Sequence, residues 1–229
     1  MGYEILLLDL DDTILDFHKA ERIAIAKTIR DFGVEPTEEV LARYHTINKW
    51  HWEQLELGKL TRAEVLENRF GVLFSQLGVK ADQAACAKAY EKNLSIGHYF
   101  LPGAEEAVEY LSKHYRLFLV SNGTASVQKG RMTSANLYRF FEKVFVSQEI
   151  GHNKPSPAYF DACFSQIEGF EKEKAIIVGD SLTSDIKGGI QAGIATCWVN
   201  PDHLPGREDI PADYQIEALR QLPSLLASI

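Results

Sequence analysis

The feature that most constrains the fold is a series of short apolar runs, each of which ends in polar residues. Five of these runs are residues 5–10, 116–123, 143–147, 175–180 and 195–200. Their length and their content of Val, Ile, Leu and Phe are typical of buried β-strands. Residues 214–216 predict a short sixth strand at the end of the series.

Stretches with helical character separate the runs, at residues 124–137, 157–167 and 183–192. Strand and helix in alternation predict an α/β fold with a parallel sheet that helices cover on both faces. Right-handed crossovers place the carboxyl ends of all strands at one edge of such a sheet. Ligands of open α/β sheets bind at that edge, so we expect the functional site there.

Residues 17–96 interrupt this alternation, because they contain several helical patterns in a row and no clear strand. They predict an inserted helical cap subdomain, which leaves residues 1–16 and 97–229 as the core domain. Thr61 and Glu64 form a capping-box pattern that predicts a helix ending at Leu77, before Gly78. An insert after the first strand lies above the ligand edge, where it can close over a substrate.

Charge and cysteine content restrict the partners and the compartment. The formal net charge is -8, so the overall field repels nucleic acid polymers and anionic lipid surfaces. Three widely spaced cysteines suggest neither a disulfide framework nor a zinc cluster. Without a basic leader or an apolar run of about 18 residues, the chain is expected to be a cytoplasmic protein that binds a small molecule and no membrane.

Acidic residues gather after two of the predicted strands. Asp9, Asp11 and Asp12 follow the first strand, and Asp180 and Asp185 follow the fourth. Like charges about 4 Å apart repel by several kcal/mol at an intermediate dielectric constant, so a compensating cation is expected. Mg²⁺ suits carboxylate oxygens and water. The alternative for the first three aspartates is a solvated turn or a helix cap.

Groups suited to an anion follow the other two strands. Ser121, Asn122 and Gly123 end the second strand and open a helix, and Lys154 follows the third strand. Free backbone amides at such a turn favour anions. Each feature alone is typical of an ordinary helix cap or a surface lysine. Acid, hydroxyl, lysine and acid at four successive strand ends together indicate a phosphate site with a cation.

These residues resemble the motifs of the haloacid dehalogenase-like hydrolase superfamily. Asp9–Thr13 matches its D-x-D-x-T motif, Ser121 its strand-ending serine or threonine, Lys154 its lysine, and Gly179–Asp185 its G-D-x-x-x-x-D motif. The resemblance spans the whole chain. It implies a Rossmann-like three-layer core with an all-helical cap. It also implies that Ser121 and Lys154 are catalytic and bind phosphate, and that Asn122 and Gly123 bind phosphate beside them.

The same resemblance implies roles for the acidic residues. Asp9 is then the nucleophile and Asp11 the general acid and later the general base. Mg²⁺ is held by Asp9, the Asp11 carbonyl and Asp180, with Asp185 as a further ligand or as a partner of the ligands. A carboxylate at position 11 favours a phosphatase over a dehalogenase, while mutases of the same fold also keep it.

Residues 48–61 of the cap resemble the corresponding segment of bacterial pyrimidine 5'-nucleotidases that act on noncanonical nucleotides. Residues 189–200 of the core resemble the same enzymes. Asn48 and Trp52 share one helix face, where they are candidates to contact a base. The alternative is that Asn48 is a satisfied buried amide and the aromatic residues pack the cap. We therefore expect a 5'-nucleotidase that prefers pyrimidine nucleoside monophosphates. The alternative is a phosphatase or phosphomutase acting on a sugar phosphate or another small metabolite.

Overall fold

The computed structural model describes residues 2–229. Within them, six strands form one parallel sheet in the order β3-β2-β1-β4-β5-β6, which confirms the predicted α/β fold. The strands are β1 (Ile5–Leu8), β2 (Arg116–Ser121), β3 (Lys143–Val146), β4 (Ala175–Gly179), β5 (Ala195–Val199) and β6 (Tyr214–Ile216). The first strand lies in the middle of the sheet, so the residues after it lie at its centre.

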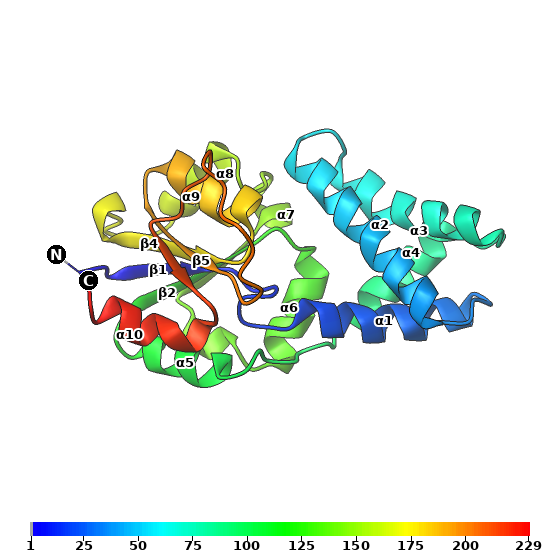
Figure 1. The fold of residues 1–229 in the computed structure, drawn as a ribbon, viewed down its shortest axis with the longest axis horizontal. Coiled ribbons are helices and arrows are strands. Elements are labelled where there is room, and N and C mark those ends of the chain that lie inside the picture. The colour runs from blue at the N-terminus through cyan, green and yellow to red at the C-terminus, as the bar shows by residue number, and fades with distance from the viewer. Residues whose placement is uncertain (1) are drawn as a thin grey trace.

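Helices cover both faces of the sheet, as Figure 1 shows: α5 and α10 lie on one side and α8 and α9 on the other. The helices that follow the insert are α5 (Ala104–Ser112), α6 (Ala125–Ser134), α7 (Ser147–Ile150), α8 (Pro157–Phe164), α9 (Lys187–Ala192) and α10 (Leu222–Leu226). Shorter helical turns are η1 (Tyr138–Phe140), η2 (Lys172–Lys174), η3 (Leu182–Ile186) and η4 (Leu219–Gln221).

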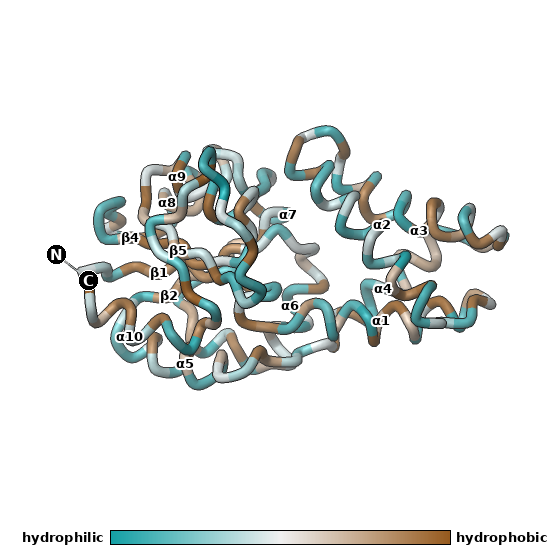
Figure 2. Tube along the Cα trace, in the orientation of Figure 1, coloured by the Kyte–Doolittle hydropathy of each residue, from teal (hydrophilic) through white to brown (hydrophobic). Residues whose placement is uncertain are grey.

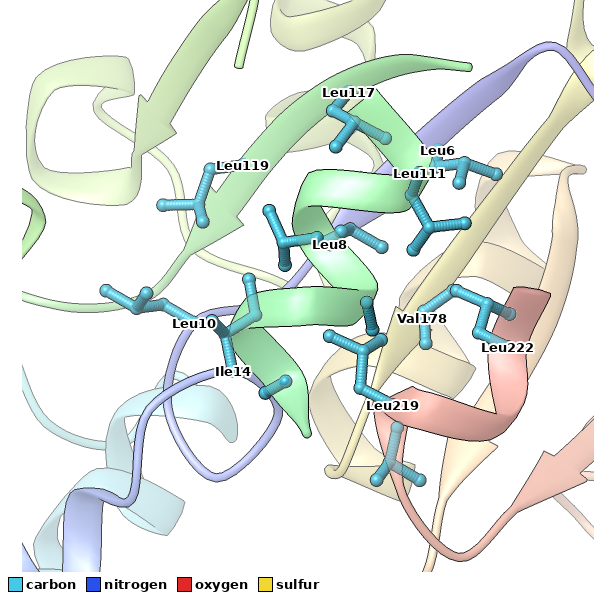
Figure 3. Close-up of a cluster of buried hydrophobic side chains, with 14 of the residues drawn as sticks. Leu6, Leu8, Leu10, Ile14, Leu111, Leu117, Leu119, Val178, Leu219 and Leu222 are labelled. Carbon is cyan, nitrogen blue, oxygen red and sulfur yellow. The ribbon is translucent and has the colours of Figure 1, made fainter. Parts of the chain in front are cut away.

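Both faces of β1 are buried, because successive side chains of a strand point to opposite sides. Leu6 and Leu8 belong to the cluster beneath α5 and α10, which Figure 3 shows, and Ile5 and Leu7 belong to the cluster beneath α8. Figure 2 shows hydrophobic colouring along parts of the central strands and more hydrophilic colouring in many of the loops and helices around them. Burying each leucine contributes about 1.5–3 kcal/mol of transfer free energy, which fixes this strand at the centre.

Four further helices lie between β1 and α5 and have a hydrophobic cluster of their own. They are α1 (Phe17–Asp31), α2 (Glu38–Glu56), α3 (Arg62–Leu77) and α4 (Gln83–Leu94). The prediction for the third of them is confirmed: Thr61 and Glu64 form the capping box, and Gly78 ends the helix with φ of 66°. Figure 1 shows this group beyond the carboxyl ends of the strands. We refer to it below as the cap.

The chain passes between core and cap twice, and the two passages lie next to each other. The amide of Asp16 donates to the carbonyl of Tyr99 at 2.8 Å, and the amide of Leu101 donates to that of Ile14 at 3.0 Å. Both connections therefore leave the core at one place, close to the residues that follow β1. No helix among residues 2–229 has the length and apolarity needed to cross a membrane.

Candidate active site

Three carboxylates from two neighbouring strand ends meet at the centre of the sheet edge. Strands β1 and β4 pair in parallel with Leu8 opposite Val178, so the residues that follow them lie level. One oxygen each of Asp9, Asp180 and Asp185 lies within 4.8 Å of the others. Oxygen donors gathered in this way are the ligands that Mg²⁺ takes, so these residues fit the ion.

The electrostatics of this carboxylate cluster call for more positive charge. Burial raises the pKa of Asp9 to about 8 against the attraction of Lys154, and Asp185 contributes to the rise. Burial, followed by the charges of Asp9 and Asp185, raises the pKa of Asp180 well above its usual range. A cation bound among the oxygens would favour their charged forms and lower these pKa values.

Lys154 supplies one positive charge to this cluster from the segment after β3. The residue is 1% exposed, and its Nζ donates to Asp9 Oδ1 at 2.6 Å, Asp185 Oδ1 at 2.6 Å and the Val120 carbonyl at 2.9 Å. Burial alone would lower the pKa of Lys154, but Asp185 and Asp9 raise it above its usual value. The ammonium therefore stays charged and fixes one oxygen each of Asp9 and Asp185.

A glycine and an unusual turn bring Asp185 back to the sheet. The predicted helix over residues 183–192 begins instead with η3, a π-helical turn, and continues as α9. This turn places Asp185 Oδ2 where it accepts from the Ser181 amide at 3.1 Å. A Cβ on Gly179 would lie 2.3 Å from the Asp185 carboxylate, so only glycine permits this approach.

The turn after β2 presents a hydroxyl and an amide. Ser121 Oγ accepts from the Gly123 amide at 3.1 Å and from Gln128 Nε2 at 2.8 Å. A Cβ on Gly123 would lie 2.4 Å from Gln128 Nε2, so glycine lets this turn close tightly. We refer to residues 121–123 as the phosphate loop.

Asn122 joins the phosphate loop to two other segments. Its Nδ2 donates to the Lys154 carbonyl at 2.9 Å and to Ser184 Oγ at 3.2 Å, and its Oδ1 accepts from the Lys154 amide at 2.8 Å. The carboxamide thus connects the segments that follow β2, β3 and β4. Its direct contact with phosphate stays a prediction.

Asp11 is held by two residues of α6 that the motifs do not include. Its carboxylate accepts from Gln128 Nε2 at 2.7 Å and forms an ion pair with Arg131. Arg131 is fully buried, and its Nε donates to the Gly97 carbonyl at 2.9 Å, beside the passage to the cap. The three-residue spacing of Gln128 and Arg131 places both on one face of α6, but it does not indicate what that face contacts.

The third aspartate of the first motif has a separate role. Asp12 adopts φ of 55°, and its Oδ1 accepts from the Phe17 amide at 2.9 Å at the start of α1. Its carboxylate therefore accepts from the first amide of α1, whose N-cap residue is Asp16, and such a role at a helix end is the alternative expected for the acidic trio. Asp9 and Asp11 have other partners, as described above.

The two cap candidates lie in different surroundings. Asn48 is 2% exposed, its Nδ2 donates to Glu21 Oε1 at 2.6 Å, and its Oδ1 accepts from Arg69 Nη1 at 2.7 Å. This is the geometry of a satisfied buried amide, and contact with a base stays a prediction. Trp52 is half-buried, and its ring lies 5.5 Å from the guanidinium carbon of Arg62, a residue that the sequence motifs did not indicate.

Comparisons with known proteins agree with this geometry. The family model of haloacid dehalogenase-like hydrolases matches residues 6–199. HAD-hydrolase YfnB of Bacillus subtilis is 40% identical over 98% of this chain and 95% of its own. Pyrimidine 5'-nucleotidase PynA of Streptococcus pneumoniae is 36% identical over 97% of this chain and 94% of its own length. Pyrimidine 5'-nucleotidase YjjG of Escherichia coli is 27% identical over 99% of both chains.

A crystal structure of YfnB bound to magnesium superposes on the chain with a TM-score of 0.94 and covers 99% of both. Magnesium is the cofactor that hydrolases of this family use, and the carboxylates of Asp9, Asp180 and Asp185 fit it. The family model and these relatives span the core and the cap alike. The chain therefore belongs to the haloacid dehalogenase-like hydrolases.

Proposed function

We propose that the protein is a Mg²⁺-dependent phosphomonoester hydrolase that acts through an aspartyl-phosphate and prefers pyrimidine nucleoside 5'-monophosphates. The observation that carries the reaction is the meeting of the carboxylates of Asp9, Asp180 and Asp185, two of which, Asp9 and Asp185, accept from the ammonium of Lys154. The observation that favours the substrate is that PynA and YjjG, both named pyrimidine 5'-nucleotidases, match nearly the whole chain, cap included.

Asp9 is the proposed nucleophile because it is the carboxylate at the centre of the sheet edge. Lys154 holds one of its oxygens at 2.6 Å and orients the carboxylate for attack on phosphorus. The attack transfers the phosphoryl group to Asp9 and expels the alcohol, and water then hydrolyses the acyl phosphate. Two displacements of moderate barrier replace one of high barrier.

Asp11 is the proposed general acid and base. It donates a proton to the leaving oxygen in the first step and removes one from water in the second. Gln128 and Arg131 fix its position through the bonds described above. Ser121 and the phosphate-loop amides hold the transferred oxygens, and bound Mg²⁺ supplies the charge that offsets their repulsion from Asp9.

The first prediction concerns substrate choice. Purified protein with Mg²⁺ should release phosphate from dUMP or dTMP faster than from AMP or a hexose phosphate, and EDTA should stop the release. Asp9→Asn is the matched control, since it keeps the shape of the side chain and removes the nucleophile. We expect it to lower turnover by at least about 10³-fold while the circular dichroism spectrum is unchanged.

Two results would contradict parts of the proposal separately. Turnover of sugar phosphates without turnover of any nucleotide would contradict the proposed nucleotide substrate, while the proposed reaction, phosphomonoester hydrolysis, would stand. Full activity of the Asp9→Asn variant would remove Asp9 from the nucleophile's role.

A further inference from the structure

A single arginine of the cap reaches into the core beside the catalytic residues. Arg62 is the first residue of α3, and the capping box of Thr61 and Glu64 fixes the start of that helix. The Thr61 amide donates to Glu64 Oε2 at 2.7 Å, and the Glu64 amide donates to Thr61 Oγ at 3.3 Å. The guanidinium is therefore delivered from a defined helix end.

Its four terminal hydrogens are all engaged by core acceptors. Nη1 donates to the carbonyls of Asn122 and Gly123, both at 3.0 Å, and Nη2 donates to Ser147 Oγ and Asn153 Oδ1, both at 2.6 Å. Each terminal nitrogen of arginine carries two hydrogens, so these four bonds use all of them. The group is thus built to hold protein atoms in place rather than to bind a substrate phosphate.

The four acceptors belong to the segments that carry the catalytic groups. Two are carbonyls of the phosphate loop, directly after Ser121. Asn153 immediately precedes Lys154, and Ser147 follows β3 at the start of α7. One planar guanidinium therefore joins the segments after β2 and β3, and it does so from the cap.

Trp52 supports this group from α2. Its ring lies 5.5 Å from the guanidinium carbon, a distance at which a cation is attracted to the face of an indole. The indole restricts where the arginine can point without taking up any of its hydrogens. This contact accounts for a half-buried tryptophan near the site without a stacked base.

We propose that Arg62 is a positioning residue that couples the closed cap to the order of the phosphate loop and of the Lys154 segment. When the cap is closed, its guanidinium fixes the carbonyl side of the loop, so that the amides and Ser121 Oγ on the other side face the transferred oxygens. The proposal rests on phosphomonoester hydrolysis at Asp9, but it does not depend on which base the enzyme prefers.

The test compares Arg62→Ala and Arg62→Lys with Arg43→Ala, which removes an arginine from an exposed pair with Glu39 elsewhere on the cap. The substrates are a nucleoside monophosphate and p-nitrophenyl phosphate, which has no base or sugar. We expect kcat of Arg62→Ala to fall by about tenfold or more on both, because misplacement by about 1 Å costs up to 100-fold. Lysine cannot bridge both segments, so Arg62→Lys should recover little activity, whereas added guanidinium ion should restore part of it to Arg62→Ala.

Hydrogen exchange gives a readout that needs no substrate. The amides of Gly123 and Lys154 are bonded to Ser121 Oγ and Asn122 Oδ1, and both should exchange faster in the Arg62 variants than in Arg43→Ala. If Arg62→Ala does not fold, Arg62→Lys decides by the same measurements. A kcat within twofold of the parent, or a loss confined to the nucleotide, would overturn the proposal, as would unchanged exchange. A parent protein inactive on every phosphate ester would instead overturn the proposed reaction.

Discussion

Lys154 links the stability of the core to its chemistry. Its ammonium is buried between Asp9 and Asp185, with Nζ to oxygen distances of 2.6 Å to each. Removing one partner of a buried ion pair leaves the other charges without compensation, which is more costly than never having formed the pair. The same contact orients the proposed nucleophile, so a change here is expected to affect folding and turnover together.

We predict that Lys154→Met lowers the free energy of unfolding by roughly 3–5 kcal/mol. It should also reduce phosphate release by about 100-fold or more, because a positive group beside the reacting phosphoryl is lost. Urea denaturation and steady-state kinetics measure the two effects. The control is Lys174→Met, which removes partly exposed ion pairs with Glu4 and Glu171 and should cost less than about 1 kcal/mol. Equal losses in the two variants would contradict the prediction.

The sequence shows which residues stand at the strand ends, but not which polar residues from elsewhere contact them. Asp9, Ser121, Lys154 and Asp180 were located because each follows an apolar run. The contacts of Arg62 and Arg131 depend on how the cap and α6 dock against those ends, and helical periodicity carries no such information. Spacing also could not decide whether Asn48 faced a ligand or the buried pair of Glu21 and Arg69.

At the scale of elements, the strands were predicted to within two residues at each end, because buried strands of a parallel sheet are continuous apolar runs. The main departure is η3, where a regular helix was predicted. Its cause is tertiary: Asp185 turns back to Lys154 and to the Ser181 amide, and the backbone widens to allow this. Widened turns of this kind are frequent at functional sites.

The turn η3 also contacts the cap through α2. Thr183 Oγ donates to Glu56 Oε2 at 2.8 Å, which joins the end of α2 to the segment that carries Asp185. Burial raises the pKa of Glu56 to about 7, with the bond from Thr183 opposing the rise and the charge of Asp185 adding to it. The carboxyl group therefore titrates near neutrality at the boundary between cap and core.

This pKa predicts how the Glu56 carboxyl group affects the stability of the protein as the pH changes. The folded value of about 7 lies above the ordinary value of 4.5, so the contribution of the protonated carboxyl group to stability is full below pH 4.5 and is lost as the pH rises through 7. We compare the melting temperatures of the parent and Glu56→Gln in EDTA. The parent value minus the variant value should decrease by at least about 2 °C as the pH is raised from 5 to 8. Glu53→Gln, an exposed change on the same helix, should leave the corresponding difference constant. A difference for Glu56→Gln that stays constant with pH would contradict the assignment.

At the scale of the molecule, a cation bound at the sheet edge is expected to stabilise the whole fold. The carboxylates that fit it follow β1 and β4, which are neighbours at the centre of the sheet, and they are brought together only in the folded chain. A ligand that binds the native state alone raises stability by mass action. Relief of repulsion among the three carboxylates acts in the same direction.

We predict that Mg²⁺ at about 100 times its dissociation constant raises the melting temperature of the EDTA-treated protein by roughly 5–10 °C, from about 2.7 kcal/mol of binding linkage. Asp180→Asn should abolish most of this rise. At neutral pH the same variant should melt higher than the parent in EDTA, because the raised pKa of Asp180 means that the folded parent must keep this carboxyl group protonated, at a cost in free energy that asparagine does not have. Differential scanning calorimetry with both proteins measures the effects, and an equal rise in the variant would place the ion elsewhere.

The two passages between core and cap have a consequence for how such enzymes diversify. The backbones of Asp16 and Tyr99 are hydrogen-bonded to each other, so the residues between them form a single insertion that leaves the core and returns to it at one place. A cap from a relative grafted between these two residues is expected to leave strand order, register and the carboxylates of Asp9, Asp180 and Asp185 intact. On the proposed roles, such a graft would change the choice of substrate and keep the reaction, provided that the incoming cap brings its own counterpart of Arg62.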